Sequence, residues 1–313
     1  MLNRFSAPCR CLILWLAALA ASQPAMARTL LVGPTRDLTR PSAAALVAAD
    51  GDTIQIDPGS YTDCAVWRAS QLTVIAAGPG VTLRDRVCQA QGIFVTTGND
   101  ITIRGITFTG ARAPSHNGAG IRAQGRNLTV IDSRFIDNEN GILAAPMPGS
   151  TIRVLDSEFR GNGTCARECA HGIYINRVDL LDIERSRFID QYIGHHIKSR
   201  ALRTVLIDDT ITDGPDGTSS YLVDLPNGGD LLLRGCVLEK GSKSDNPVAA
   251  VMIGEEGLTN PTQSIELLDN QFRNDLARPT IFLRNGTHVS AELVGNRISG
   301  RVVMLDGAGT IRP

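Results

Sequence analysis

Polar side chains that could move protons concentrate in three successive segments, HGIYIN (171–176), GHHIKSR (194–200) and SYLVDLPNGG (220–229). Three of the five histidines in the chain fall between positions 171 and 196. The interval from His171 to His195 is close to the interval from Lys198 to Asp224. Such similar intervals predict that these groups stack along one outer face of a regularly repeating structure.

This combination of side chains suits the removal of a proton next to a carboxylate, as in the elimination or epimerisation of a uronic acid. The carbanion that forms is inaccessible unless the carboxylate charge is neutralised, which Arg200 or Lys198 could do. A base must take the proton, and the candidates are His195 and Lys198. An acid must supply one, and the candidates are Tyr174 and His171.

The remaining candidate residues lie beside these groups. If Ile173, Ile175 and Ile197 point inward, strand alternation turns Tyr174, His196 and Lys198 outward. Arg200 follows on the same parity, and Asp224 does so if Val223 and Leu225 point inward. Asp224 is expected to orient a cation or to help hold Ca²⁺, and no other cofactor is indicated. Substrate contacts are predicted for three further side chains, Asn176, His196 and Asn227.

A carboxylate pair at Asp208-Asp209 suggests a different chemistry, glycoside hydrolysis. GHHIKSR (194–200) also has a faint resemblance to the GHG and RIK elements of polygalacturonase-type hydrolases, but in that family the paired aspartates precede the GHG element, and here they follow it. Adjacent residues on a strand point to opposite faces and cannot flank one bond together. We therefore interpret Asp208-Asp209 as a structural turn.

The elements that must position these residues are short strands in a repeat. One series of segments ends in a bulky apolar residue at near-regular intervals, at Phe108, Phe135, Phe159, Phe188, Ile211, Leu238, Phe272 and Ile298. A second series of apolar segments, near positions 92, 119, 140, 171, 195, 221, 250 and 280, repeats on the same period. Short strands without intervening helices predict a coil in which each strand pairs in parallel with its counterpart one turn later.

We therefore expect an all-β fold, a single-stranded right-handed parallel β-helix of about 8 to 10 coils. Residues 39–49 read as a short capping helix with Pro41 near its first turn, and a first strand follows in GDTIQIDPGSY (51–61). This helix, strand and turn resemble the start of many right-handed β-helix proteins of the pectate-lyase-like superfamily. The resemblance spans the chain beyond residue 27. It implies the fold and leaves the activity open, because one fold carries many functions.

Five cysteines lie in the same region. Cys64 and Cys88 are one coil apart, and Cys165 and Cys169 flank a tight excursion, so both pairs are candidate disulfides. Cys236 occupies a position two before the terminal apolar residue, where the other coils carry Ile106, Ser133, Ser157, Ser186, Asp209, Asn270 and Asn296. We expect this set to form an inward-facing ladder, with Cys236 as a buried small residue.

The N-terminus predicts export. Arg4 and Arg10 precede an apolar run at 11–21, and Ala25-Met26-Ala27 ends it with small residues, as in a secretory signal peptide over residues 1–27. Residues 28–313 are then expected to form one domain, periplasmic or secreted, without a transmembrane segment after cleavage. The net charge of −1 disfavours a nucleic-acid partner. The pattern does not indicate an oligomeric state.

Three functions remain open. The first is a lyase or C5-epimerase acting on a uronate-containing polysaccharide. The second is a non-catalytic β-helix that binds carbohydrate, acidic or neutral, or has a structural role in the cell envelope, since any β-helix shows polar residues to water. The third is a glycoside hydrolase, which lacks a convincing carboxylate pair.

Overall fold

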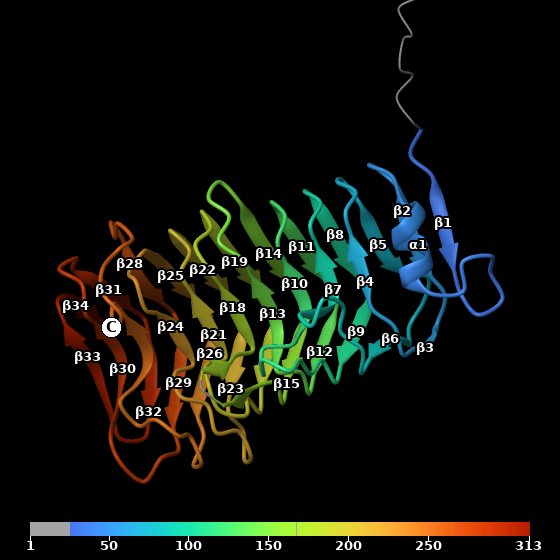
Figure 1. Cartoon of the computed structure of the whole chain (residues 1–313). Helices are drawn as coiled ribbons and strands as arrows, with labels where there is room; N and C mark the ends of the chain where they lie inside the picture. Colours follow the sequence, from blue (N-terminus) through green and yellow to red (C-terminus); the bar gives the residue numbers. More distant parts are fainter. Residues whose placement is uncertain (1–25, 167) are drawn as a thin grey trace, which may run out of the picture.

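The chain forms a right-handed parallel β-helix in which the strands of three sheets succeed one another along one axis (Figure 1). A computed structural model describes residues 26–166 and 168–313, so most of the predicted signal peptide lies outside the described residues. Within this part of the chain the coil makes about 11 turns, slightly more than the 8 to 10 expected. No helix in the described ranges has the length and apolar character needed to span a membrane.

Each regular turn contributes one strand to each sheet. Sheet A has twelve strands among the described residues: β1 (Thr29–Val32), β2 (Thr53–Ile56), β5 (Thr73–Ala76), β8 (Ile101–Arg104), β11 (Leu128–Ile131), β14 (Thr151–Leu155), β19 (Leu180–Glu184), β22 (Arg203–Ile207), β25 (Asp230–Arg234), β28 (Ile265–Leu268), β31 (Ala291–Val294) and β34 (Gly309–Arg312).

Sheet B follows sheet A after a sharp corner and contains the first series of apolar segments. Its strands are β3 (Gly59–Tyr61), β6 (Val81–Arg84), β9 (Ile106–Thr109), β12 (Arg134–Ile136), β15 (Glu158–Arg160), β20 (Arg187–Ile189), β23 (Thr210–Thr212), β26 (Val237–Lys240), β29 (Gln271–Asn274) and β32 (Arg297–Ser299).

Sheet C contains the second series and the candidate chemistry. Its strands are β4 (Ala65–Trp67), β7 (Gly92–Thr96), β10 (Ala119–Ala123), β13 (Asn140–Ala144), β18 (Ile173–Ile175), β21 (Ile197–Ser199), β24 (Val223–Leu225), β27 (Ala249–Ile253), β30 (Thr280–Asn285) and β33 (Val302–Gly307). All neighbouring strands of the three sheets pair in parallel, as in Tyr174 beside Lys198 and Lys198 beside Asp224.

The N-terminal end of the coil carries the predicted helix, α1 (Pro41–Val47), which packs against β1 and β4. Pro41 stands at its first turn, and Ala44 is fully buried. Strand β1 precedes α1, whereas the sequence pattern placed the first strand after the helix. Because β1 pairs in parallel with β2, the segment 53–56 is covered on its open edge.

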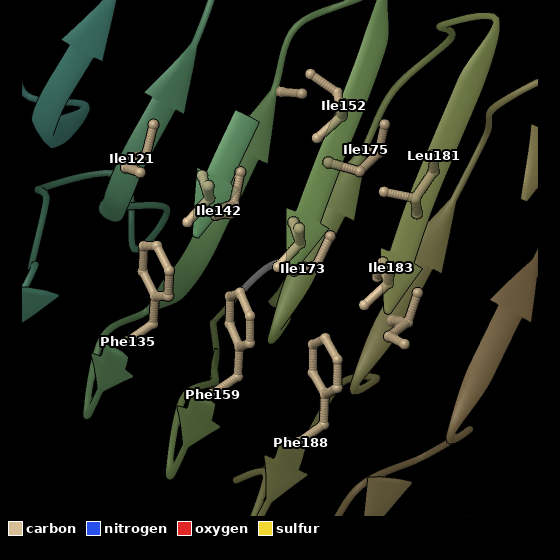
Figure 2. Packing of buried hydrophobic residues seen from close by; sticks show 14 of the residues in the cluster. Ile121, Phe135, Ile142, Ile152, Phe159, Ile173, Ile175, Leu181, Ile183 and Phe188 are labelled. Atoms are coloured by element: carbon tan, nitrogen blue, oxygen red, sulfur yellow. The ribbon is translucent and has the colours of Figure 1, made fainter. Parts of the chain in front are cut away.

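The core is a set of columns in which equivalent side chains of successive turns stack (Figure 2). The rings of Phe135, Phe159 and Phe188 lie parallel, with centroids 4.6 Å apart at both steps. Ile142 and Ile173 form a second column from sheet C. Since each coil buries its apolar face on the next, the register of every outward residue of sheet C is determined by this core.

The predicted polar ladder lies at the corner between sheets A and B. Backbone N–H groups of one turn donate to the side chain of the next: Ser133 to Ser157 Oγ (3.2 Å), Ser157 to Ser186 Oγ (3.1 Å) and Ser186 to Asp209 Oδ1 (2.7 Å). Cys236 continues the ladder, because its sulfur accepts from the Asp209 N–H at 3.4 Å. The corner itself is made by residues with positive φ, at Asp132, Asp156, Asp208 and Asp269. This confirms that Asp208-Asp209 is a structural turn.

Both predicted disulfides are present. Cys64 and Cys88 join across a Cα–Cα distance of 5.4 Å, and Cys165 pairs with Cys169 across the hairpin of β16 (Thr164–Cys165) and β17 (Cys169–Ala170). Cys236 is free and fully buried.

Replacing Cys64 and Cys88 by serine is expected to lower the free energy of unfolding by about 3 kcal/mol, because the bridge closes a loop of 24 residues in the unfolded chain. Urea unfolding of the oxidised protein measures the change. The same replacement at Cys165 and Cys169 serves as a comparison and should cost less, since that loop is much shorter. Equal losses for both pairs would contradict the loop-closure explanation.

Candidate functional site

Tyr174, Lys198 and Asp224 occupy equivalent positions on the adjacent strands β18, β21 and β24 of sheet C. Their strand neighbours Ile173, Ile197 and Val223 are fully buried in the core. Alternation therefore places the three polar side chains on the other face of the sheet, as expected. The repeat brings these three side chains together from three separate turns without any help from loops.

Three rings form a second column, three residues before the first one. The rings of His171 and His195 stack with centroids 4.8 Å apart, and Tyr221 stacks on His195 at 5.2 Å. Sequence reasoning did not select Tyr221, although it precedes Asp224 by the same three residues that separate His195 from Lys198. That shared offset was the signal that could have found it.

The two histidines are tied into the backbone of the next turn. The N–H of His195 donates to His171 Nδ1 (3.0 Å), and the N–H of Tyr221 donates to His195 Nδ1 (3.1 Å). Both Nδ1 atoms are therefore acceptors, and each neutral ring carries its proton on Nε2. Burial, aided by nearby cations, holds the pKa of His171 well below its usual value and lowers that of His195 to about 3. Both imidazole rings are therefore uncharged and bound to the backbone of the next turn.

Asp224 lies almost completely buried between a histidine and a lysine. Its Oδ2 atom is 3.4 Å from His195 Nε2 and 3.6 Å from Lys198 Nζ. Its Oδ1 atom has no hydrogen-bond partner among the described residues. Burial raises the pKa of Asp224 to about 7, although the charge of Lys198 opposes that shift. The carboxyl can therefore exchange a proton near neutral pH.

Two cations flank the ring of Tyr174. Lys198 Nζ and the Arg200 guanidinium carbon each lie 5.7 Å from the ring centroid. Arg200 Nε donates to the Tyr174 hydroxyl at 3.1 Å, and its Nη1 donates to Asn227 Oδ1. The phenol is thus held beside a permanent positive charge, which stabilises any negative charge that develops on it or near it.

A single carboxylate, Glu256, bridges the two cations. Its Oε1 accepts from Lys198 Nζ at 2.7 Å, and its Oε2 accepts from Arg200 Nη2 at 2.6 Å. Partial burial raises the pKa of Glu256, but these two hydrogen bonds outweigh it and keep the pKa below its usual range. Sequence reasoning missed Glu256, which lies in the coil with the longest spacing, between Leu238 and Phe272. The extra length of this coil indicates an inserted loop, but it does not show which residues that loop contacts.

His196 is not on the outer face, contrary to the prediction that it binds substrate. Its ring is fully buried, with Nε2 2.9 Å from Asp213 Oδ1. Asp213 Oδ2 also accepts from the Gly241 N–H (3.1 Å) and from Ser244 Oγ. Strand β21 begins only at Ile197, so strand alternation does not extend back to residue 196.

The two other predicted substrate contacts support neighbouring backbone. Asn176 Nδ2 donates to the carbonyl of Ala144 at 2.8 Å. Asn227 Nδ2 donates to the carbonyl of Gly257 at 3.1 Å, next to Glu256. Both amide donors are used for these backbone contacts, at the end of β13 and in the loop that carries Glu256.

A cavity of about 340 Å³ adjoins Tyr174 on the side of the earlier coils. It is lined by Ser115, His116, Asn117, Ala166, Glu168, Cys169 and Tyr174. Its walls come from the loop before β10 and from the disulfide-closed hairpin of β16 and β17. The cavity therefore extends from Tyr174 toward the earlier coils.

The fold is similar to that of two solved polysaccharide lyases. The crystal structure of pectate lyase Pel9A superimposes with a TM-score of 0.56 and 15% identity, covering 91% of this chain and 77% of that one. The alginate lyase from Paenibacillus sp. str. FPU-7 gives 0.63 and 15% identity, covering 90% and 99%. At this identity the likeness shows the shared fold. Comparison with curated proteins finds no match.

One family model, described as periplasmic copper-binding protein (NosD), matches residues 42–208. Copper sites in proteins use imidazole and sulfur ligands. Over residues 26–166 and 168–313, no three side chains of His, Cys, Asp or Glu gather closely enough to hold a metal ion. The Nδ1 atoms of His171 and His195 already accept backbone hydrogen bonds. These two histidines do not fit a copper centre, and the role of Asp224 in holding Ca²⁺ stays a prediction.

The matched segment begins in α1 and runs through the strands of all three sheets as far as the end of β22. It includes the two stacked histidines, Lys198 and Arg200, whereas Asp224 and Glu256 lie beyond it. Because this segment is more than half of the 313 residues, the chain belongs to the NosD family of parallel β-helix proteins.

Proposed function

We propose that this protein is periplasmic or secreted and that it acts on a uronate-containing polysaccharide, as a lyase or a C5-epimerase. The observation that carries the proposal is that Lys198 and Arg200 together hold one carboxylate beside the Tyr174 hydroxyl. A uronate carboxylate at this position would have its charge neutralised, which is the first requirement for removing the neighbouring proton. The family description and the two lyases of similar fold support the compartment and the substrate class.

The geometry supports Lys198 over His195 as the proposed base. His195 Nδ1 is occupied by the N–H of Tyr221, and its protonated Nε2 faces Asp224. Lys198 Nζ lies 3.6 Å from Asp224 Oδ2, in a carboxylate that can accept a proton. We therefore assign Lys198 as the base. Asp224 would accept the ammonium proton of Lys198 before the reaction, and Arg200 would neutralise the substrate carboxylate.

The acid is assigned in the same way. His171 is almost completely buried and its Nδ1 accepts a backbone hydrogen bond. The Tyr174 hydroxyl is hydrogen-bonded to Arg200, and the Tyr174 side chain borders the cavity. In a lyase, Tyr174 would protonate the leaving glycosidic oxygen. In an epimerase, it would return a proton to the opposite face of the sugar carbon.

A non-catalytic glycan-binding protein is the second candidate. It is favoured by one observation, the neutral and backbone-bonded state of both histidines, which a purely structural ladder would share. A glycoside hydrolase is not supported, because Asp209 is buried in the corner ladder while Asp208 is exposed.

The test is incubation of the purified mature protein with alginate, polygalacturonate and glucuronan. We expect the absorbance of unsaturated uronates to rise with one of them, or the epimer ratio measured by NMR to change. Neutral cellulose oligomers should give no product. Retention of an acidic polymer without any product would favour the binding protein instead, and neither product nor retention would refute both.

A further inference from the structure

Glu256 occupies the place that the proposed function gives to the substrate. Each of its oxygens contacts one cation, Oε1 at 2.7 Å from Lys198 Nζ and Oε2 at 2.6 Å from Arg200 Nη2. A uronate carboxylate has the same charge and the same two acceptor oxygens. The substrate and Glu256 therefore cannot occupy the two cations at the same time.

The loop that presents Glu256 is anchored at points around its side chain. The Glu256 N–H donates to the carbonyl of Pro226 (2.9 Å), and Glu255 Oε1 accepts from the Tyr221 hydroxyl (3.0 Å). Gly254 and Gly257 on either side have φ of +87° and +95°, values that favour glycine. The backbone position is thus determined by the loop, and the side chain alone must move to vacate the cations.

The Glu256 side chain is able to leave. It is 44% exposed, whereas Lys198 is 11% and Arg200 20% exposed. Exposed ion pairs are weakly held because water solvates the released carboxylate. The two cations remain in place without it, since Arg200 is held by Tyr174 and Asn227 and Lys198 faces Asp224.

We propose that Glu256 is an internal competing ligand, which fills the carboxylate subsite of Lys198 and Arg200 until a uronate carboxylate displaces it. This inference rests on the proposed function. It also specifies the substrate class, because a neutral polysaccharide has no carboxylate to exchange for Glu256 and leaves the cations occupied. Displacing Glu256 by a neutral chain is unfavourable, because the two cations would lose their carboxylate partner. The site thereby selects acidic over neutral chains.

The test compares the mature wild-type protein with Glu256→Gln and Glu256→Ala by calorimetric titration. The probes are hexamers of mannuronate and galacturonate, and a cellulose hexamer as the neutral probe. Removing the internal carboxylate should tighten binding of an acidic hexamer at least about fivefold, and leave binding of the neutral hexamer unchanged. Glu292→Gln is the matched control, since Glu292 is similarly exposed at 53% and paired with Arg312 on sheet A.

A second measurement follows the cations without any sugar. The rate at which a small acylating reagent modifies Lys198, read by peptide mass spectrometry, should rise in both Glu256 variants and stay constant in Glu292→Gln. Equal binding of acidic hexamers by the wild type and both variants, with unchanged labelling, would overturn the inference and leave the proposed function standing. Absence of acidic binding in every protein would overturn both.

Discussion

Lys198→Ala is expected to lower the rate of uronate cleavage or epimerisation by about 10²- to 10⁴-fold, because it removes the proposed base. The fold should survive. Without Lys198, whose charge lowers the pKa of Asp224, the buried carboxyl takes up a proton near pH 7, so no bare buried charge is left behind. Initial rates on the polymer that the wild type modifies measure the loss, and circular dichroism reports the fold.

Lys243→Ala provides the matched control. Lys243 is 57% exposed, pairs with Asp216 and lies outside the candidate site, so its variant should keep the wild-type rate. Lys198→Arg separates charge from proton transfer, since arginine keeps the cation but cannot act as a base near neutral pH. Full activity in Lys198→Arg would show that residue 198 acts only as a cation, and full activity in Lys198→Ala would exclude it from the chemistry.

Asp209→Asn is expected to stabilise the protein at pH 7 and above. Burial raises the pKa of Asp209 to about 8 in the folded state, whereas the pKa of an unfolded aspartate is about 3.9. Between about pH 4 and pH 8 the unfolded chain therefore releases a proton that the folded chain keeps. As the pH rises through this window, the free energy of unfolding falls by up to about 1.4 kcal/mol per pH unit. Asparagine does not ionise, so the variant should lose most of this slope.

The ladder suggests that asparagine fits this position. Asn270 and Asn296 hold the same position in later turns, and each amide donates to a backbone carbonyl of sheet A, at 2.9 Å to Leu233 and 2.7 Å to Leu267. Asp209 Oδ2 has no such partner in the part of the chain described. Chemical denaturation at a series of pH values measures the slopes. Asp208→Asn, at the exposed neighbouring residue, should keep the wild-type slope, and an unchanged slope in Asp209→Asn would refute the buried-carboxyl explanation.

Most of the fold could be predicted from the repeat. The main feature that this prediction missed is the separation of sheet A from sheet B, and the reason is local. Both apolar series became strands, of sheets B and C. The sequence pattern did not separate sheet A from sheet B, because very few residues lie between their strands. Asp132 and Ser133, for example, are the only residues between β11 and β12. A corner this short depends on the positive φ of Asp132, +48°. The spacing of apolar residues does not reveal such a change in chain direction, although aspartate tolerates a positive φ.

The candidate site also contains residues that the strand repeat positions and residues that lie outside the repeat. Tyr174, Lys198 and Asp224 could be placed from the sequence because the buried isoleucines and valines determine their register on sheet C. Tyr221 obeys the same repeat and was overlooked. His196 was assigned to the wrong face because it precedes β21, where alternation does not hold.

The sequence by itself determined the coil, the stacking of its side chains and the column that carries Lys198, since a periodic core leaves each strand only one register. Only the tertiary structure revealed that Glu256, far along the chain from Lys198, returns to cover its amine. That contact depends on a loop whose path follows from individual hydrogen bonds and two glycine conformations, and no period in the sequence encodes it.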